Sequence, residues 1–514
     1  MARTTLASQK GLAKTTGLLI GLTGLGLLFL PYALPSILKL ESAVYWTLGA
    51  ISVGCLIYIH YAYKGRLEGI KNNGVWHNGL SNRGALGWLV AMALTGFYVA
   101  LYFYPKTLGY DPEGNGGIVA LFDPLSKVLN GKAATQWFVY GTLYTLAILI
   151  FGVKFIYKYK GNRYQIFRTL SVMFFQLGFA FLLPEFLSLM HADTPYFAKD
   201  IKNMWPLNYY FFESWHLKNM LQGGGLGMFM LLSGLAMIFI VSPILTYKYG
   251  KRWYCSWVCG CGALAETAGD PFRQLSSKKI SVWKLERWMI HVVLVLIFLT
   301  TIALIWSFLR TNGDMVGIQK ESFVYFIVVF LGMVMGAIYY FKRKELDKDA
   351  VYTMISMSVI IGGILSIQAF SGERNILFIN SYTLSKWYGF GVGAAFSGVL
   401  GVGFYPILGS RVWCRFGCPM AAILGLQQRL FSRFRITTNG GQCISCGNCS
   451  AYCEMGIDVR AYAQKGQNIV RSSCVGCGIC SAVCPRGVLK LENGAVANRT
   501  AAPRFPLGNN FELN

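Results

Sequence analysis

The sequence predicts an all-α polytopic membrane protein of about ten transmembrane helices, with a small α+β module at its C-terminal end. Two observations predict this fold. Hydrophobic residues make up 54% of the 514 residues and charged residues only 13%, with a mean hydropathy of +0.45, a composition typical of membrane proteins. The second observation is a dense, regularly spaced group of cysteines between residues 443 and 484, beyond the last apolar run.

Apolar runs long enough to cross about 30 Å of hydrocarbon recur along the chain. The first run shows no small-residue cleavage site, so we interpret it as an uncleaved span rather than a signal peptide. The predicted spans are 14–35, 43–63, 85–105, 135–157, 168–190, 223–247, 288–309, 323–341, 351–371 and 388–409.

The net charge of +25 follows the predicted topology. If the N-terminus is cytoplasmic, the inner segments carry about twice as many Lys and Arg residues as the outer loops, which is the positive-inside pattern. We therefore expect a multi-pass protein of the bacterial inner membrane, in contact with membrane lipid, with both termini in the cytoplasm. Because the basic charge has this topological explanation, no nucleic-acid partner is expected.

Four regions follow from these patterns. They are an N-terminal transmembrane region at 1–222 with about five spans, a C-terminal transmembrane region at 223–436, a ferredoxin-like module at 437–492 and an irregular tail at 493–514. The basic amphipathic segment Met420–Ile436 (MAAILGLQQRLFSRFRI) precedes the module, and we interpret it as a helix on the membrane surface.

One internal repeat lies in the second region. GKRWYCSWVCGCGAL (Gly250–Leu264) aligns without gaps on GSRVWCRFGCPMAAI (Gly409–Ile423). Each copy contains a C-x3-C motif and follows a span that runs from the outer to the inner face. The two motifs are therefore expected at the same cytoplasmic face.

The module carries two motifs of the form C-x2-C-x2-C-x3-C, in CISCGNCSAYC and CVGCGICSAVCP. This spacing is typical of bacterial ferredoxins with two [4Fe-4S] clusters, in which the fourth cysteine of each motif ligates the other cluster. Paired zinc sites are the alternative, although zinc sites rarely repeat all four offsets. Glu454 follows Cys453 where a proline is usual. The predicted ligands are Cys443, Cys446, Cys449 and Cys484 for one cluster, and Cys474, Cys477, Cys480 and Cys453 for the second.

The C-x3-C cysteines form the second candidate site. Cys255 and Cys259, like Cys414 and Cys418, are spaced i, i+4 and would share one helical face if each segment is helical. Brought together by the repeat, these four thiolates could ligate a third iron–sulfur cluster, whose negative charge Arg252, Arg411 and Arg415 would offset. Four buried structural thiols are the alternative. Cys261 has no counterpart in the second copy and is interpreted as a spare thiol, and Cys55 as a packing residue.

These motifs resemble the membrane polyferredoxin family that includes NapH and the C-terminal membrane part of NosR, with the CcoG-type copper reductases as looser relatives. The resemblance rests on W-Y-C-x3-C (253–259), W-C-x3-C-P (413–419) and the ferredoxin pair (443–485). It implies electron transfer between the quinol pool, cytoplasmic iron–sulfur centres and an extracytoplasmic reductase or maturation system. Gly260 departs from the family by replacing the first proline, Cys261 is an additional residue, and the first five spans match no family.

Three weaker candidates complete the set. Glu185 is an intramembrane carboxylate near His191, and together they could accept protons from a quinol. The sequence has no C-x2-C-H motif, and its five histidines lie near helix ends, so haem is not favoured. The aromatic loop Pro195–Met220 is either an interfacial belt or a docking surface for an extracytoplasmic partner. The histidines are His60, His77, His191, His216 and His291.

The sequence thus predicts an integral membrane electron-transfer protein. It would link the quinol pool and inner-face [4Fe-4S] clusters to a redox partner protein in the membrane or outside the cytoplasm. Three alternatives stay open. They are a membrane-bound reductase of a metal ion or other small substrate, an ion-translocating redox subunit, and an assembly protein with structural clusters.

Overall fold

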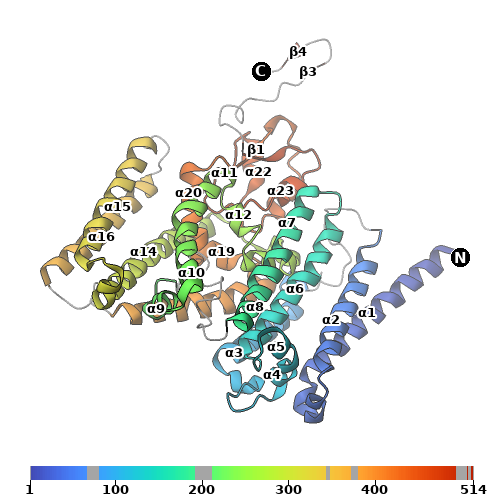
Figure 1. The fold of residues 1–514 in the computed structure, drawn as a ribbon. Helices are drawn as coiled ribbons and strands as arrows, with labels where there is room; N and C mark the ends of the chain where they lie inside the picture. Colours follow the sequence, from blue (N-terminus) through green and yellow to red (C-terminus); the bar gives the residue numbers. More distant parts are fainter. Residues whose placement is uncertain are drawn as a thin grey trace.

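The computed structural model describes residues 2–65, 80–191, 211–342, 348–371, 380–493, 506–507 and 511–512. The fold is mostly helical, with two small antiparallel sheets in these ranges. The module lies at one end of the helical bundle (Figure 1), which we call the module end, and the opposite end we call the far end.

Eight helical segments in the described residues are long and apolar enough to cross a membrane, and they coincide with the first eight predicted spans. Two of them are built from consecutive helices, and both of these contain a π-helical section. The elements are α1 (Ala2–Ala33), α2 (Ala43–Tyr63), α3 (Ala85–Phe103), α6 (Gln136–Lys158), α7 (Arg163–Phe174) with η5 (Phe175–Leu182) and α8 (Leu183–Met190), α10 (Gly224–Ala236) with η8 (Met237–Val241) and α11 (Ser242–Tyr249), α14 (Ile280–Val316) and α15 (Lys320–Lys342).

The ninth and tenth predicted spans are helical but shorter or irregular. α16 (Lys348–Ser371) contains a shorter apolar stretch, Val351–Leu365. The tenth region consists of α17 (Ser381–Tyr388), the π-helix η10 (Gly389–Gly403) and α18 (Tyr405–Leu408). The number of spans beyond eight stays a prediction.

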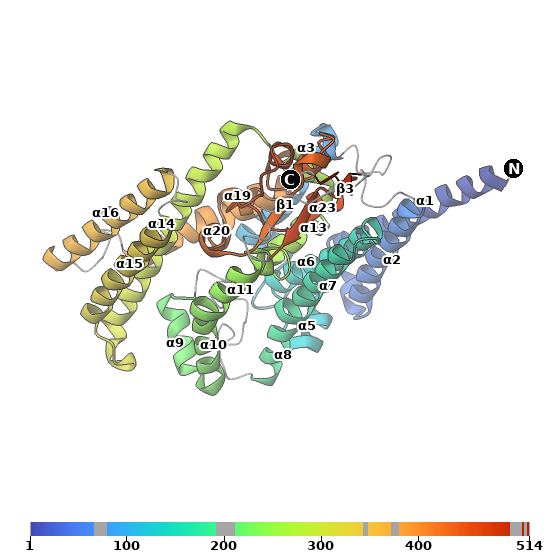
Figure 2. The same cartoon turned by 90° about the horizontal axis from the view of Figure 1, so that it is seen from above.

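Short helices close the far end of the bundle. They include η1 (Pro35–Lys39), η4 (Pro105–Leu108), α4 (Gly117–Leu121), α5 (Asp123–Asn130) and α9 (Ser214–Gln222), while η3 (Leu80–Asn82) precedes α3. Viewed from the module (Figure 2), α1 and α2 flank one side of the molecule and α14 to α16 the other.

The module is a small α+β unit, as predicted. Its sheet pairs β1 (Arg435–Thr438) with β2 (Leu489–Glu492) in antiparallel register, with Ile436 opposite Leu491. Its short helices are η11 (Gly440–Gln442), α21 (Asn448–Ala451), α22 (Val459–Gln464) and α23 (Ile479–Ala482). In the tail, β3 (Pro506–Leu507) pairs with β4 (Phe511–Glu512), and the rest of 494–514 lies outside the described residues.

Both repeat copies fold alike between the bundle and the module. The first consists of α12 (Arg252–Cys255), α13 (Gly260–Thr267) and η9 (Asp270–Leu275), the second of α19 (Val412–Phe416) and α20 (Pro419–Phe431). Gly250 and Gly409 begin the two copies with positive φ, +68° and +97°, where a side chain would be strained.

The prediction of a membrane-surface helix at Met420–Ile436 is wrong. α20 packs against α11 and α14, and Leu424 is 1% exposed. Its Gln428 side chain donates to the carbonyl oxygens of Arg471 and Cys474 in the module, at 2.8 and 2.9 Å. α20 is thus covered on several sides by other elements of the same chain, and it belongs to the protein core despite its basic residues.

Candidate metal-cluster sites

The module contains two cavities, each lined by four of its cysteines. The first is lined by Cys443, Cys446, Cys449 and Cys484. The second is lined by Cys453, Cys474, Cys477 and Cys480. Each cavity thus combines three cysteines of one motif with the fourth cysteine of the other, which is the exchange that the spacing predicts.

Left-handed glycines shape both cavities. Gly447 and Gly478, with φ of +78° and +76°, precede the short helices α21 and α23 that carry Cys449 and Cys480. This backbone conformation lets the loop curve around a central object while its amides point inward. The loops are therefore shaped to bind a compact anionic group.

The two cavities differ in position. Cys446 of the first cavity is exposed, and the side chains of Arg460 and Arg486 line the same opening. The second cavity faces the bundle, where Tyr164 donates to the carbonyl oxygen of Gly476 at 2.9 Å and Gln165 to that of Cys477 at 2.9 Å. The first cavity is thus open at the protein surface, and the second lies between it and the membrane helices.

The two cysteines of each C-x3-C motif do not share one helix, contrary to the prediction. Cys255 ends α12, and Cys259 has extended backbone as the N-cap of α13. Cys414 lies in α19, and Cys418 is the N-cap of α20, where its sulfur accepts from the Ala421 amide at 3.4 Å. The chain breaks between the cysteines, so each pair comes from two helices.

This break directs two helix N-termini at the site. Helix N-termini carry partial positive charge, which offsets part of the cost of burying a thiolate at Cys259 and Cys418. Gly260 and Pro419 are the first helical residues, as the sequence indicates. A methyl group at Gly260 would lie 2.6 Å from Gln176 Oε1 and 3.1 Å from the Tyr144 hydroxyl, which explains why a larger residue is absent there.

The four C-x3-C cysteines pack into one apolar cluster that spans the bundle and the module. Cys255 and Cys414 are buried in it, with Cys259 and Cys418 packed alongside. Arg411 connects the two repeat copies, because its Nη1 lies 3.6 Å from Cys414 Sγ and 3.3 Å from the carbonyl oxygen of Cys255. The same cluster contains seven of the eight module cysteines, all except the exposed Cys446.

The two unassigned cysteines differ. Cys261 contacts Cys259, and a hydrogen bond from the Cys261 thiol, together with the Gly262 amide and Arg411, holds the pKa of Cys259 below its usual range despite burial. Cys261 is therefore adjacent to the site rather than remote from it. Cys55 packs against a small apolar cluster of α2 and α6, which agrees with a packing role.

A chain of buried charges connects the module to the bundle, and sequence reasoning missed it. Arg411 Nε lies 3.1 Å and Arg273 Nη1 3.0 Å from the two carboxylate oxygens of Glu454. The chain continues on both sides through further ion pairs, which join residues far apart in the sequence except for the pair Asp270–Arg273. Its members in order are Lys158, Asp270, Arg273, Glu454, Arg411, Glu266 and Arg168, all with side chains at most 3% exposed.

The replacement of the usual proline by Glu454 was the only sequence signal of this chain of charges. Oxygen atoms of Glu454 and Glu266 lie within 4.8 Å of each other and of the Cys477 sulfur. Arginines already pair with both carboxylates, so these groups are counterions rather than metal ligands.

Buried cations exceed buried anions around the cysteines. Among the described residues of this half of the molecule, the buried cations are Lys154, Lys158, Arg168, Lys251, Arg273, Arg411 and Arg415, and the buried carboxylates are Glu266, Asp270, Glu286 and Glu454. Lys251, fully buried, is within electrostatic range of Cys255 and of Cys474. An unbalanced buried charge is costly, so the donor set fits thiolate-ligated, negatively charged clusters.

Of the three predicted charge-offsetting arginines, Arg411 alone contacts a cysteine sulfur in the described contacts. Arg415 pairs with Glu286 at 2.8 Å, and Arg252 stacks on Phe434 with 4.6 Å from its guanidinium carbon to the ring centre.

Glu185 and His191 lie apart from the cysteines, near the far end. Glu185 is buried on α8 and accepts from Asn130 Nδ2 of α5 at 2.6 Å. His191 follows α8 directly. This partner gives Glu185 a structural role in joining α5 to α8, and its part in quinol chemistry stays a prediction.

The remaining candidates are partly outside the described residues. His60 Nδ1 lies 3.2 Å from the Tyr157 hydroxyl, and His216 Nδ1 lies 3.1 Å from the carbonyl oxygen of Phe211. His77 and residues 195–210 of the aromatic loop fall outside the described ranges.

Two family models match the chain. One is described as a 4Fe-4S dicluster domain and matches residues 435–485. The other is described as a 4Fe-4S binding domain and matches residues 230–282 and 391–437, so it covers both copies of the repeat. Ferredoxin-type 4Fe-4S domains are thus present in the module, and the C-x3-C regions are similar to iron–sulfur sequences as well.

A curated relative is named "Putative electron transport protein YccM" from Escherichia coli (strain K12), with 24% identity over 224 residues. The alignment covers 44% of this chain and 47% of the relative, so the chain spans about half the length of the relative that it matches. No solved structure matches the chain.

Proposed function

We propose that this chain is an integral membrane iron–sulfur electron-transfer protein of the bacterial inner membrane. The observation that carries the proposal is that each module cavity is lined by four cysteines drawn from both ferredoxin motifs. The match to a 4Fe-4S dicluster domain and the name of the E. coli relative support it. In this proposal the module cavities hold two [4Fe-4S] clusters, and Cys255, Cys259, Cys414 and Cys418 ligate a third.

The three sites form a series from the surface into the bundle. The first cavity is open at Cys446, and the second is covered by α7. The C-x3-C cysteines pack in the same group of apolar side chains as the cysteines of the second cavity. Iron–sulfur clusters supply reversible one-electron carriers over a wide range of potentials. The chain's own residues hold these carriers, exclude water and balance their charge, with Arg411 between Cys414 and Glu454. We propose transfer through this series to a redox partner, as in NapH-like and NosR-like proteins.

A link to the quinol pool has separate support. An apolar cavity lies between η8, α11, α14, α15 and α20, and its lining includes Phe239, Phe298, Phe326 and Gln427. The side-chain oxygen of Gln427 has no hydrogen-bond partner among the described residues. Gln427 lies nine residues after Cys418, about 13 Å along α20. We propose that a quinol headgroup donates to this oxygen while its isoprenoid tail fills the apolar cavity.

The topology of the proposed protein places both termini and the module in the cytoplasm. The distribution of Lys and Arg supports this orientation. The division into 1–222, 223–436, 437–492 and 493–514 is part of the same proposal. The partner would be extracytoplasmic or membrane-bound.

Iron and sulfide quantification with EPR-monitored redox titration of the purified protein tests the proposal. We expect three cluster signals. Cys255→Ser and Cys414→Ser should each remove one signal and leave the two module signals, whereas Cys55→Ser should remove none. Two signals only in the unmodified protein would show that the C-x3-C cysteines are structural thiols.

A quinol-oxidation assay tests the quinol link. Gln427→Leu should slow reduction of the clusters by quinol and leave their reduction by dithionite unchanged. Gln467→Leu, at an exposed glutamine of the module, is the matched control. Equal rates of quinol oxidation in all three proteins would remove this cavity from the proposal.

A further inference from the structure

The C-x3-C site lies deep in the bundle, not at its surface. Positions along helix α6 give a measure of this depth. At the module end, Lys158 of α6 pairs with Asp270 at 2.8 Å, while Tyr144 of the same helix reaches Gly260, next to Cys259. These two residues of α6 are 14 positions apart, or about 21 Å along the helix. Only about 12 Å separates Tyr144 from Gln136, where α6 begins at the far end.

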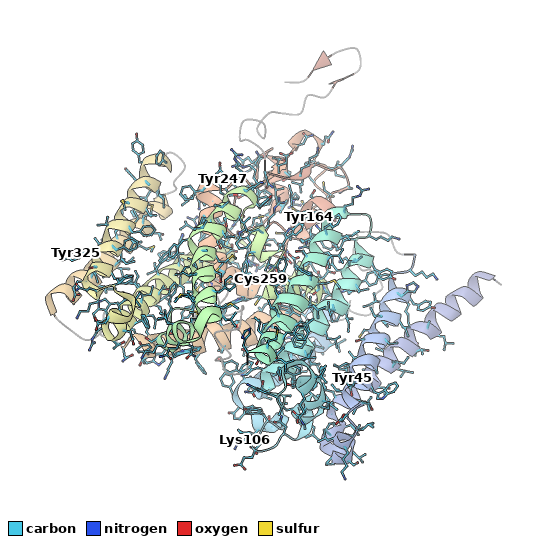
Figure 3. All side chains as sticks on the ribbon, in the orientation of Figure 1. Tyr45, Lys106, Tyr164, Tyr247, Cys259 and Tyr325 are labelled. Carbon is cyan, nitrogen blue, oxygen red and sulfur yellow. The ribbon has the colours of Figure 1, made fainter. Side chains whose placement is uncertain are left out.

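The neighbouring helix gives the same depth. Gln176 donates to the carbonyl oxygen of Val258 at 2.7 Å, and it lies in η5, the π-helical section well below the start of α7 at the module. π-Helical sections are frequent at functional sites. Figure 3 shows Cys259 between Tyr164, near the module, and Lys106, at the far end.

A line of aromatic rings continues from this point to the far end. The ring centres of Tyr144 and Tyr140 are 5.5 Å apart, those of Tyr140 and Trp137 6.5 Å, and those of Trp137 and Tyr102 5.3 Å. Trp137 is 47% exposed, so the line reaches the surface. The interior along it is densely packed, because Phe138 and Val139 beside it belong to a buried apolar cluster.

We propose that electrons leave the C-x3-C site through Tyr144, Tyr140 and Trp137 to an acceptor at the far end of the bundle. This inference rests on the proposed third cluster. One electron leaves the reduced cluster, which returns to its oxidised state, and reduces a metal-centred one-electron acceptor such as a haem or copper protein. No bond forms or breaks and no proton moves. The rings are not oxidised themselves. They fill the space between the cluster and the acceptor with bonded, polarisable atoms, through which the electron-tunnelling rate decreases less steeply with distance than through empty space.

Quinone-free phospholipid vesicles test the route. The protein is reconstituted, and vesicles with the module outward are identified by protease access to it. Dithionite outside supplies electrons, and ferricyanide trapped inside accepts them. We expect reduction of the trapped ferricyanide, slowed several-fold by Tyr144→Leu and by Trp137→Leu. Tyr144→Phe, which keeps the ring, should retain the original rate. Trp46→Leu, at an exposed tryptophan of α2 away from the line, is the matched control.

A second measurement tests the depth without relying on turnover. A membrane-impermeant dysprosium chelate should enhance the spin relaxation of the C-x3-C cluster more from inside these vesicles than from outside. The same variants must keep the EPR signal of this cluster.

The outcomes separate the route from the function on which it rests. Full rates in Tyr144→Leu and Trp137→Leu, stronger relaxation from outside, or ferricyanide reduction only after quinone is added would overturn the route and leave the clusters in place. Absence of the third EPR signal from the unmodified protein would instead overturn the proposed third cluster, and the route with it.

Discussion

Glu454 provides a direct test of the electrostatics around the second module cavity. We predict that Glu454→Gln raises the reduction potential of the cluster that we propose at Cys453, Cys474, Cys477 and Cys480. A carboxylate oxygen of Glu454 lies within 4.8 Å of the Cys477 sulfur, and a unit charge at that distance contributes about 3.5 kcal/mol at an effective dielectric constant of about 20. This energy corresponds to about 150 mV for one electron.

The measured shift should be smaller than this point-charge value. The electron is spread over the whole cluster, and the two arginines that now pair with Glu454 can turn toward their other carboxylate partners, Asp270 and Glu266. We therefore expect an increase between about 50 and 150 mV. The variant should fold, because Arg273 still forms its ion pair with Asp270 and Arg411 still forms its ion pair with Glu266. Its cost in unfolding free energy should stay below the roughly 3–5 kcal/mol that follows when a buried pair loses its partner entirely.

EPR-monitored redox titration of the purified protein measures this shift. The first module cluster should change less, because Glu454 lines only the second cavity. Glu321→Gln, at an exposed carboxylate of α15, is the matched control and should leave all potentials unchanged. An unaltered potential in a Glu454→Gln protein with intact signals would refute the assigned position of this charge.

Three further predictions concern the module and its docking. Gly476→Ala should lower the thermal unfolding midpoint, because φ is +64° and the added methyl would lie 2.7 Å from Arg252 Cβ. Gly466→Ala, with φ of +63° and open space around it, is the control that separates the backbone strain from the contact with Arg252. Equal losses in both variants would argue against that contact. Asp270→Asn should weaken the dependence of the unfolding free energy on pH in the acid range. Burial raises the pKa of the Asp270 carboxyl, but the opposing effect of Lys158 and Arg273 is larger, so its net pKa is depressed. The contribution of Asp270 is then present above the unfolded pKa of about 3.9 and lost as the pH falls below it. Denaturation midpoints followed by tryptophan fluorescence between neutral and acid pH measure this, and identical pH profiles would contradict it. Cys484→Ser should remove the same EPR signal as Cys443→Ser and leave the signal that depends on Cys474, whereas loss of the latter signal would show that the two motifs do not exchange their fourth cysteines.

Features set by local sequence could be predicted. Eight spans follow from the length and apolarity of single helices, and the two module cavities agree with the offsets within and between two short motifs. The starts of α13 and α20 at Gly260 and Pro419 also follow from residue type, since both suit the first turn after a break.

Features set by contacts distant in the sequence could not be predicted. The i, i+4 spacing suggested a shared helical face, but the backbone is extended at Cys259 and Cys418, so the two cysteines of each motif do not lie on one helix. The pairing of Arg411 with Glu454 joins parts of the chain that no periodicity connects. The basic residues of α20 suggested a membrane surface, whereas Gln428 and the apolar side chains around it are covered by the module. The depth of Gly260 depends on Tyr144 and Gln176 of two other helices.

The close packing around Gly476 and Gly478 has a consequence for the order in which the protein assembles. Side chains of Tyr164, Gln165 and Arg252 contact the loop that carries Cys474 and Cys477. For the cluster proposed in the second cavity, we therefore expect iron and sulfide to enter before the module is seated on the bundle. We expect cells short of iron to accumulate chains whose modules stay unseated and open to proteases, so that the amount of intact protein follows the iron supply.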